Sequence, residues 1–557
     1  MSVHVRERNH CDRNEARPPP TAQPVLASLL LVSVLAMSCV AKNAFAMTWY
    51  VRSDGGTATQ CGGQSNAAYP GHGAHQACAF NHPFWALPPG SESSNHEPAS
   101  VLKPGDTLVI GAGSYMIGYG APNSETSMCY RPATWGCTMA GIPSGIDAAH
   151  PTTIAGDCAK PPVLWGTQRV SSIFDIQHVH DVVIKCLDLT DHSACIEFYK
   201  PTTNTGGVTA CDRDKFPYGE WAANGIHAAD VRNLTLEHMD IHGFADYGIQ
   251  AGRLSGTTTV RNVALRADGW GGWSGDLGGN NHKSSDSGKL TFTGLKVLWN
   301  GCGEAYPAAT VVGCWGQSEG GYGDGFGEAW TGGDWVFEHS DFKHNTQDGL
   351  DMLYANGTGS VTIDHVIAWQ NAGNGIKTSG PATLRSSIVN GYCNNWAGFP
   401  IAGDDRSGVS GSMCRADGTA VVMEFNGIGQ TISLIDNTIT GNGDTLFVGG
   451  GGDAGYTPDA SNVTDFESNV LLGQASVIPR NDGQPTALAW YGDGAYAGTL
   501  KYRNNVIWNV KHDFCPAGNI CKDPRLKNES LAAFDPTPLP GSPALGAAVG
   551  GNIGGVQ

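Results

Sequence analysis

Asp348-Gly349-Leu350-Asp351 and Asn374-Gly375-Ile376-Lys377 are two copies, 26 residues apart, of one short template. In each copy an Asn or Asp precedes a glycine, a bulky apolar residue follows, and the fourth position varies. Asn/Asp-Gly pairs supply tight or left-handed turns, and β-strand alternation sends the third residue inward and the fourth outward. The template therefore predicts a turn followed by a short strand, with Leu350 in a core and Asp351 on the outer face.

The same template recurs through the middle of the chain. Its other copies are Asn224-Gly225-Ile226-His227, the degenerate Tyr247-Gly248-Ile249-Gln250, Asp268-Gly269-Trp270-Gly271, Asn300-Gly301-Cys302-Gly303 and Asp324-Gly325-Phe326-Gly327. Successive copies are 23, 21, 32, 24, 24 and 26 residues apart, and we interpret the 32-residue interval as carrying a loop. Short β-branched runs such as Val361-Thr362-Ile363 lie between the copies. This period predicts an all-β chain folded as a parallel β-helix, a solenoid in which each rung buries its apolar residues against the next.

The composition excludes several other classes. Glycine supplies 77 of the 557 residues, about twice the usual ~7%, and 51 acidic residues outnumber 33 basic ones. Such an acidic chain lacks the basic stripe with which nucleic-acid-binding proteins displace counterions. The sequence also lacks the helical periodicity of a coiled coil, and its 40% hydrophobic residues, with 15 Trp, are enough to build a core. We therefore expect a Gly-rich, β-dominated globular protein that does not bind nucleic acid.

Residues 1–46 are interpreted as an export signal. Arginines precede an apolar run over residues 24–41, and Ala44-Phe45-Ala46 offers a small-x-small cleavage pattern. A retained membrane anchor is the alternative. No later stretch is apolar for about 18 residues, so we expect no membrane span after removal of the signal. The predicted location is therefore secreted, either extracellular or periplasmic.

The cysteines that follow the leader are expected to form disulfides. They fall into close sequential couples: Cys61/Cys78, Cys129/Cys137, Cys158/Cys186, Cys195/Cys211, Cys302/Cys314, Cys393/Cys414 and Cys515/Cys521. In an exported protein this arrangement predicts local staples in the loops. A metal cluster is the alternative, but the sequence contains no CxxC pair.

Both ends of the mature chain resemble a known fold. The stretches Trp49–Gly55 and Leu102–Leu108 resemble the opening rungs of secreted right-handed parallel β-helix proteins, and Gly541–Leu545 is similar to their C-terminal ending. The resemblance implies a single elongated β-helix domain. The expected divisions are an N-terminal cap with the first rungs at 47–175, the β-helix core at 176–510, and a C-terminal rung and tail at 511–557.

In a solenoid, residues one period apart become stacked neighbours. Asp324, Asp348 and Asp351 are therefore expected on adjacent rungs, with Lys377 one rung, about 4.8 Å, beyond Asp351. Three converging carboxylates repel one another unless a cation joins them. Hard oxygen ligands suit Ca²⁺, and Gln347 offers a neutral amide oxygen beside them. These four oxygen-bearing residues form the predicted calcium site, with simple turn positions as the alternative for the two Asp-Gly pairs.

Lys377 becomes a candidate general base because it lies beside this predicted cation. A nearby positive charge disfavours the ammonium form and lowers the pKa of a lysine, as a general base requires. Asp351 acts on that pKa in the opposite direction. An exposed, solvated lysine without a role is the alternative interpretation.

The same residues resemble the family 9 polysaccharide lyases, calcium-dependent β-helix enzymes that cleave pectate. The matching segments are Asp324, then Gln347-Asp348-Gly349-Leu350-Asp351, then Asn374-Gly375-Ile376-Lys377. The resemblance implies that Asp324, Asp348 and Asp351 are calcium ligands and that Lys377 is the catalytic base. Gln347 stands where the family has an Asp, and Thr378-Ser379-Gly380 replaces its Leu-Gly-Gly. The implied activity is β-elimination on an acidic polysaccharide, a uronic-acid polymer such as pectate, by a monomeric enzyme.

Three alternative functions compete with this one. A polygalacturonase-like hydrolase should show Asn-x-Asp, Asp-Asp and Gly-His-Gly in that order, but Gly71-His72-Gly73 precedes the repeats and Asp404-Asp405 follows them. The Asp-Pro-His-Asp motif of β-helix uronan epimerases is absent. A non-catalytic, exported carbohydrate-binding or surface β-helix stays open. In either case Trp270, Trp273 and Trp330 are expected in Gly-rich loops near the same face. There they could stack on sugar rings or pack against the rungs as loop anchors.

Overall fold

The computed structural model describes residues 46–546 and 554, with gaps. The gaps are 90–99, 119, 126, 128, 130–136, 168–169, 194–221, 276–285, 308–309, 316–322, 329, 354, 393–400, 403–414, 452–454, 479–480 and 491–495. The predicted leader, apart from Ala46, and the couples Cys195/Cys211 and Cys393/Cys414 lie outside the described residues. Within the described part we find no helical segment with the length and hydropathy of a bilayer-spanning helix.

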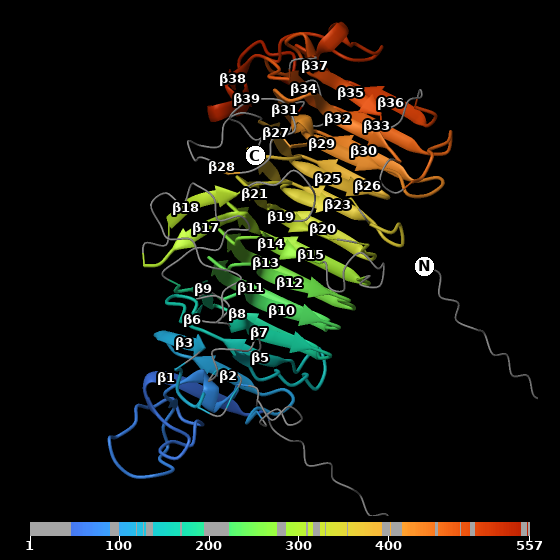
Figure 1. Cartoon of the computed structure of the whole chain (residues 1–557). Coiled ribbons are helices and arrows are strands. Elements are labelled where there is room, and N and C mark those ends of the chain that lie inside the picture. Colours follow the sequence, from blue (N-terminus) through green and yellow to red (C-terminus); the bar gives the residue numbers. More distant parts are fainter. Residues whose placement is uncertain are drawn as a thin grey trace, which may run out of the picture. The chain divides into compact units, whose positions relative to one another are not determined.

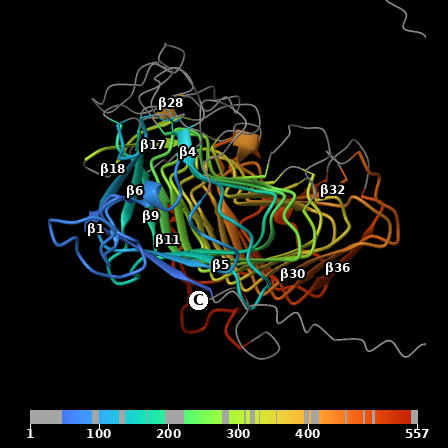
Figure 2. The same cartoon turned by 90° about the horizontal axis from the view of Figure 1, so that it is seen from below.

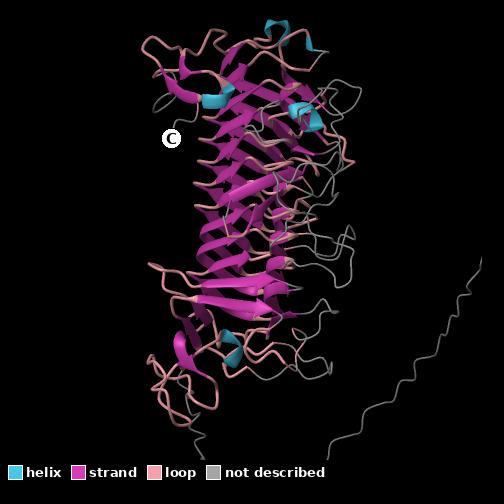
Figure 3. Cartoon of the chain, turned by 60° about the vertical axis from the view of Figure 1, so that its left-hand side comes forward, coloured by secondary structure: helices cyan, strands magenta, loops and turns pink. Residues whose placement is uncertain are grey.

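Parallel strands form two large sheets, of 11 and 23 strands. In the part of the chain that the structure describes, helices are confined to short 3₁₀ turns (Figure 3). The 11-stranded sheet contains β4 (Cys137–Met139), β7 (Val170–Gln177), β10 (Asn224–Ala229), β12 (Tyr247–Gly252), β14 (Gly271–Ser274), β19 (Asp324–Gly327), β22 (Leu350–Met352), β25 (Ile376–Ser379), β29 (Val421–Glu424), β32 (Thr445–Gly450) and β35 (Thr486–Trp490). The 3₁₀ turns are Pro83–Trp85, Arg415–Gly418, Lys511–Asp513 and Leu531–Ala533.

The 23-stranded sheet divides into two layers, joined by β11 (Arg232–His242) and β13 (Thr257–Arg266), which contribute to both. The first layer contains β1 (Thr48–Gly56), β2 (Thr107–Ile110), β5 (Thr152–Ala155), β8 (His180–Lys185), β15 (Lys289–Thr293), β20 (Asp334–Glu338), β23 (Val361–Asp364), β26 (Ala382–Arg385), β30 (Thr431–Ile435), β33 (Val463–Glu467) and β36 (Thr499–Arg503). The second layer contains β3 (Ser114–Gly118), β6 (Val163–Thr167), β9 (Asp188–Asp191), β16 (Lys296–Leu298), β21 (Asp341–Lys343), β24 (Ile367–Trp369), β27 (Ile388–Gly391), β31 (Thr438–Gly441), β34 (Val470–Gly473) and β37 (Val506–Trp508).

Each rung passes through the 11-stranded sheet, then the first layer, then the second layer, and successive rungs overlie one another (Figures 1 and 2). In five of the template copies the bulky third residue points inward, as predicted; these residues are Ile226, Ile249, Phe326, Leu350 and Ile376. One inward column of the 11-stranded sheet runs Ile226, Ile249, Trp273, Phe326, Leu350, Ile376, Val421, Phe447 and Leu488. Its members from Ile226 to Phe447 are at most 1% exposed. The chain is thus an all-β, right-handed parallel β-helix, and the predicted fold is confirmed.

Two of the template copies were placed wrongly. Tyr247 and Asp324 both pair with Gly271, so the third rung of the column is Gly271–Ser274 and begins three residues after Asp268. Asn300 does not begin a strand of this column either. The column therefore has a single 53-residue interval between Gly271 and Asp324. The sequence had predicted two intervals here, 32 residues from Asp268 to Asn300 and 24 residues from Asn300 to Asp324.

Asp268 and Asn300 belong instead to a ladder of side chains at the turn from the second layer into the 11-stranded sheet. Asn300 Nδ2 donates to Asn345 Oδ1 at 2.9 Å, and Asn345 Nδ2 donates to Asn371 Oδ1 at 2.9 Å. The backbone N–H of Asp268 donates to Asn300 Oδ1 at 3.3 Å. A second ladder, at the turn between the two layers, links Asn437, Asn469 and Asn505 in the same way. These amides satisfy turn backbone groups that each rung would otherwise bury unpaired.

The long interval contains a hairpin. β17 (Cys302–Ala305) pairs antiparallel with β18 (Thr310–Trp315), and β18 pairs with β28 (Ile401–Ala402), so the three lie together in Figure 2. Cys302–Cys314 is a disulfide across the hairpin. Glu304, which is buried, contacts His242 and Arg266 at 2.7 Å each and so fixes the hairpin to the rungs.

Five predicted disulfides are present among the described residues. They are Cys61–Cys78, Cys129–Cys137, Cys158–Cys186, Cys302–Cys314 and Cys515–Cys521. Such bonds are typical of proteins from an oxidising compartment, which agrees with an extracellular location. Residues Ala46–Gln557 form one compact unit, and the divisions at 175 and 510 stay predictions.

Candidate functional site

Three consecutive strands of the 11-stranded sheet, β19, β22 and β25, position the predicted site. Phe326 pairs with Leu350 and Gly327 with Asp351, so Asp324 lies one rung before Asp348. Asp351 pairs directly with Lys377. The inward residues Phe326, Leu350 and Ile376 anchor these strands in the core, and the fourth template positions therefore project from the outer face.

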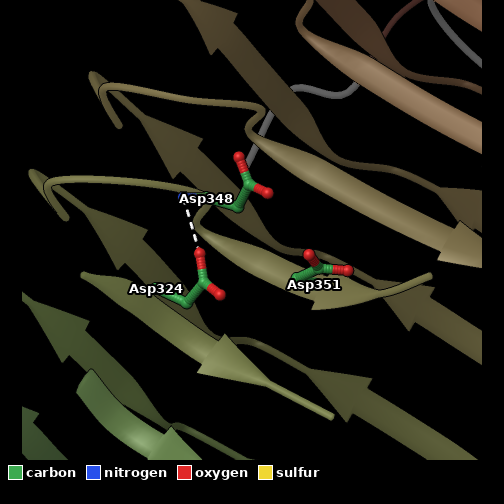
Figure 4. A group of neighbouring side chains, drawn as sticks. All are labelled: Asp324, Asp348 and Asp351. Atoms are coloured by element: carbon green, nitrogen blue, oxygen red, sulfur yellow. Dashed lines mark hydrogen bonds between the residues drawn. The ribbon is translucent and has the colours of Figure 1, made fainter. Parts of the chain in front are cut away.

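Asp324, Asp348 and Asp351 converge as predicted. One carboxylate oxygen from each lies within 4.8 Å of the others, and the side chains gather at the beginning of two neighbouring strands (Figure 4). Asp348 is 1% exposed, while Asp324 and Asp351 are each 9% exposed. Three carboxylates this close and this shielded from water repel one another strongly, so the cluster requires a positive charge.

Backbone N–H groups hold each carboxylate. Asp324 Oδ1 accepts from Asp348 N at 3.1 Å (the dashed line in Figure 4), and Asp348 Oδ1 accepts from Asn374 N at 2.7 Å. Asp351 Oδ1 accepts from Leu353 N at 2.9 Å. Each aspartate is thereby fixed by the rung itself, which is the preorganisation that a ligand site needs.

Lys377 supplies a positive charge to the cluster. Its Nζ donates to Asp351 Oδ2 at 2.9 Å and lies 3.5 Å from Asp348 Oδ2. Burial opposes the ammonium form, but the charges of Asp351, Asp348 and Asp324 outweigh it and raise the pKa of Lys377 well above its ordinary value. Burial also raises the pKa of Asp351, against the lowering effect of Lys377. In this arrangement Lys377 is therefore an ammonium ion, not a base.

The donor set fits a hard cation. Three carboxylates on a rigid scaffold, all presenting oxygen, are the ligands that Ca²⁺ prefers, and no sulfur or imidazole intervenes among these side chains. A divalent ion here would compete with the Lys377 ammonium for Asp351 Oδ2 and Asp348 Oδ2. Gln347 is 1% exposed and directly precedes Asp348, and its role as a fourth ligand stays a prediction.

Two residues that position Asp348 were not predicted. Asn374 was interpreted only as a turn residue, yet its backbone N–H holds Asp348 Oδ1 and its Nδ2 donates to Thr419 O at 2.8 Å. Gly373 leaves room for the same carboxylate, because a Cβ at this position would lie 2.1 Å from Asp348 Oδ1. Gly373 was the sequence feature that could have indicated this close approach, but the sequence alone did not connect it with Asp348.

The three tryptophans lie in different surroundings. Trp273 lies in the inward column, is 1% exposed and stacks on Phe326 with centroids 5.1 Å apart, so it cannot bind a sugar and its placement in a loop was wrong. Its Nε1 donates to the buried carboxylate of Glu328 at 2.5 Å. Trp270 and Trp330 are partly exposed, and their stacking on sugar rings stays a prediction.

Comparisons with known proteins give the fold's neighbours but no family. No protein-family profile matches the chain, and no curated protein matches its sequence. Among solved structures, the chain is similar to pectate lyase Pel9A (11% identity, TM-score 0.39, covering 92% of this chain and 96% of the other) and to a rhamnogalacturonan lyase (11%, 0.40, 87% and 92%). It is also similar to PfbA, a surface adhesin of Streptococcus pneumoniae (7%, 0.33, 74% and 87%). Similarities this distant assign no function.

Proposed function

We propose that the protein is a calcium-dependent polysaccharide lyase that cleaves a uronic-acid polymer, such as pectate, by β-elimination. We expect it to act after export and as a monomer. One observation carries the proposal: a lysine faces Asp351 across one rung, at 2.9 Å, beside three carboxylates that converge within 4.8 Å. A cation site and a candidate base thus share one outer face of the solenoid.

Asp324, Asp348 and Asp351 would hold the ion, with Gln347 beside them. When bound, Ca²⁺ would supply the charge that pairs these carboxylates with the carboxylate of the substrate and makes its C5 proton more acidic. Neutralising the three aspartates also removes the main cause of the raised pKa of Lys377. The lysine can then lose its proton and act as a base at a less alkaline pH.

The chemistry required of the chain is one proton transfer. Neutral Lys377 Nζ takes the C5 proton, the C5–H electrons form the C4=C5 double bond, and the C4–O bond breaks. The departing sugar oxygen keeps that bond's electrons and takes a proton from water. The buried setting of Lys377, whose side chain is 15% exposed, restricts competing proton exchange with solvent.

The test follows the ultraviolet absorbance of unsaturated product from polygalacturonate. We expect product only when calcium is present, loss of product on chelation, and loss in Lys377→Ala. Lys501→Ala, which removes an exposed lysine from β36, is the matched control and should retain full activity. Product formation that survives chelation or Lys377→Ala would overturn the proposal.

The same experiment separates the second candidate, a non-catalytic carbohydrate-binding β-helix. The tight pairing of Lys377 with Asp351, and Gln347 in place of an aspartate, are the observations that favour it. Calcium-dependent retention on immobilised polygalacturonate without any unsaturated product would select this alternative.

A further inference from the structure

A cavity of about 600 Å³ lies on the outer face of the second layer, away from the 11-stranded sheet that carries the candidate site. Strands β21, β24 and β27 form one side of it, and residues 533–537 of the C-terminal segment form the other. The lining residues that matter here are Lys343, His344, Trp369, Phe534 and Asp535. This volume falls within the range of small-ligand sites, roughly 300–1,000 Å³.

The C-terminal segment is fixed where it closes the cavity. β38 (Leu526–Asn528) pairs antiparallel with β39 (Asp535–Pro538), and both lie beside β27 and β31 in Figure 1. Asn390 Nδ2 donates to Leu531 O at 3.1 Å. Phe534, which is 6% exposed, packs in a hydrophobic cluster with Ile388. The cavity is therefore built by packing and hydrogen bonds that span more than 100 residues of sequence.

The apolar part of the lining is aromatic. Trp369 and Phe534 have ring centroids 6.1 Å apart and planes inclined at 50°, so they form two tilted walls. Trp369 is only partly buried, which leaves part of its indole accessible. An exposed indole face beside a second ring is a surface on which the C–H groups of a pyranose ring can pack.

The polar part offers both donors and acceptors. Lys343, with a side chain 26% exposed, pairs with Asp341 at 2.8 Å, and Asp535, 31% exposed, pairs with Lys527 at 2.8 Å. The hydrogen bond from Lys527 lowers the pKa of Asp535 to about 2, so Asp535 is a carboxylate acceptor at neutral pH.

His344 adds a neutral imidazole. Its ring stacks on Trp299 with centroids 4.3 Å apart, and burial, with Lys343 nearby, lowers the pKa of His344 to about 4. Its Nδ1 is buried and contacts no hydrogen-bond partner among the described residues.

We propose that this cavity is a second carbohydrate-binding site, which takes one or two pyranose rings of a saccharide. The aromatic walls match the apolar face of a sugar, while the ammonium, carboxylate and imidazole match its hydroxyl groups. An acyl chain would leave the remaining hydrogen-bonding positions of these groups unused. The Asp535 carboxylate disfavours an anionic ligand such as a phosphate, so we expect a neutral saccharide to bind more tightly than a uronate. The site shares no residue with the Asp324–Lys377 cluster, so it does not depend on the proposed lyase activity.

The test measures binding in the Lys377→Ala variant, so that no probe is consumed. Trigalacturonate and galactotriose are titrated separately, with calorimetry and indole fluorescence as readouts. We expect saturable binding of at least one probe, weakened about tenfold by Trp369→Leu and also by Asp535→Asn. Trp508→Leu is the matched control, because Trp508 lies in the same layer, is 42% exposed and does not line the cavity.

Preference between the two probes distinguishes a uronate ligand from a neutral one, and binding of either supports the site. Circular dichroism checks that each variant folds. If Trp369→Leu does not fold, the binding measured with Asp535→Asn tests the proposed site. The proposal is overturned if neither probe binds. It is equally overturned if binding is unchanged in the folded variants of Trp369 and Asp535.

Discussion

The outer face of the 11-stranded sheet carries two acid–base pairs of the same construction. His227 Nδ1 contacts Asp175 Oδ1 at 2.8 Å across one rung, and Lys377 Nζ contacts Asp351 Oδ2 at 2.9 Å across another. Both pairs occupy directly paired positions of the strands. The first pair is the more open, with side chains 24% and 30% exposed, against 15% and 13% for the second.

The two pairs differ in the residue that stands three positions before the aspartate. At that place the first pair has Ser172, which pairs with Asn224, whereas the second pair has Asp348, followed one rung later by Asn374. A cross-rung pair is therefore a common product of the repeat. The added carboxylates of Asp348 and Asp324 turn an ordinary ion pair into the cluster that we propose as the cation site.

The largest effect should come from removing the acid of the Lys377 pair. Asp351→Asn deletes a ligand and the partner of Lys377, and we expect the rate of unsaturated-product formation to fall by roughly 10²- to 10⁴-fold. Asp175→Asn makes the same change in the open pair and should leave the rate unchanged. Equal losses in the two variants would remove the distinction between the pairs.

Calcium should stabilise the folded protein by binding beside the Asp351–Lys377 pair, and it should not bind beside the Asp175–His227 pair. At a concentration of 100 Kd, an ion that binds only the folded state raises the free energy of unfolding by about 2.7 kcal/mol. We expect this calcium-dependent shift in thermal unfolding to be lost in Asp324→Asn and kept in Asp175→Asn. A shift retained in Asp324→Asn would place the ion elsewhere.

Asp268 differs from Asp175 and Asp351. It is a buried acid of the asparagine ladder, and no cation in the described part of the neighbouring rung pairs with it. It is fully buried, its Oδ2 has no hydrogen-bond partner among the described residues, and burial raises the pKa of Asp268 well above its ordinary value. Asp268→Asn restores the ladder amide, which can donate to Ile241 O as Asn300 donates to Leu265 O. We expect stabilisation of about 1–3 kcal/mol at neutral pH, measured by chemical denaturation.

The pH dependence of this effect has a defined sign. The folded protein keeps a proton on Asp268 that the unfolded chain releases above about pH 4, so the free energy of unfolding falls as pH rises from there towards the folded pKa. Asp268→Asn should lack this fall. The advantage of the variant should therefore grow as the pH rises above about 4, and an advantage independent of pH would contradict the explanation.

The smallest effect is expected from Gln347→Asp. A fourth carboxylate should tighten calcium binding about tenfold, or about 1.4 kcal/mol, and should lower the melting temperature when calcium is absent, because it adds repulsion. Calcium titration by calorimetry measures the first effect and a melt in chelator measures the second. Unchanged affinity would show that Gln347 does not face the ion.

The sequence allowed the fold and the central pair to be predicted because both depend on one period. Leu350 and Ile376 give the inward column, and the 26-residue spacing gives the pairing of Asp351 with Lys377. The copies at Asp268 and Asn300 were misassigned because Asn/Asp-Gly marks both the ladder and the strand start. Only the hydrogen-bond register separates the two, and shifting one rung by three residues moved Trp273 from an expected loop into the core.

The cavity at Trp369 could not be predicted from the sequence repeat. Its second wall comes from Phe534 and Asp535, which follow Trp369 by more than 160 residues and belong to no template copy. No local pattern indicates where such a segment folds back. Its position follows from apolar outer residues such as Ile388 and Val470, which the C-terminal segment covers.

The hairpin between Asn300 and Asp324 marks a turn at which the β-helix tolerates an insertion. Asn300 keeps its bonds to Asn345 whatever follows it, so the rung closes before the insertion begins. Because the entropy of loop closure rises only slowly with length, a longer or shorter insert that keeps the contacts of Glu304 with His242 and Arg266 costs little stability. Evolution or an engineer can therefore exchange the Cys302–Cys314 hairpin for another module without redesigning the scaffold.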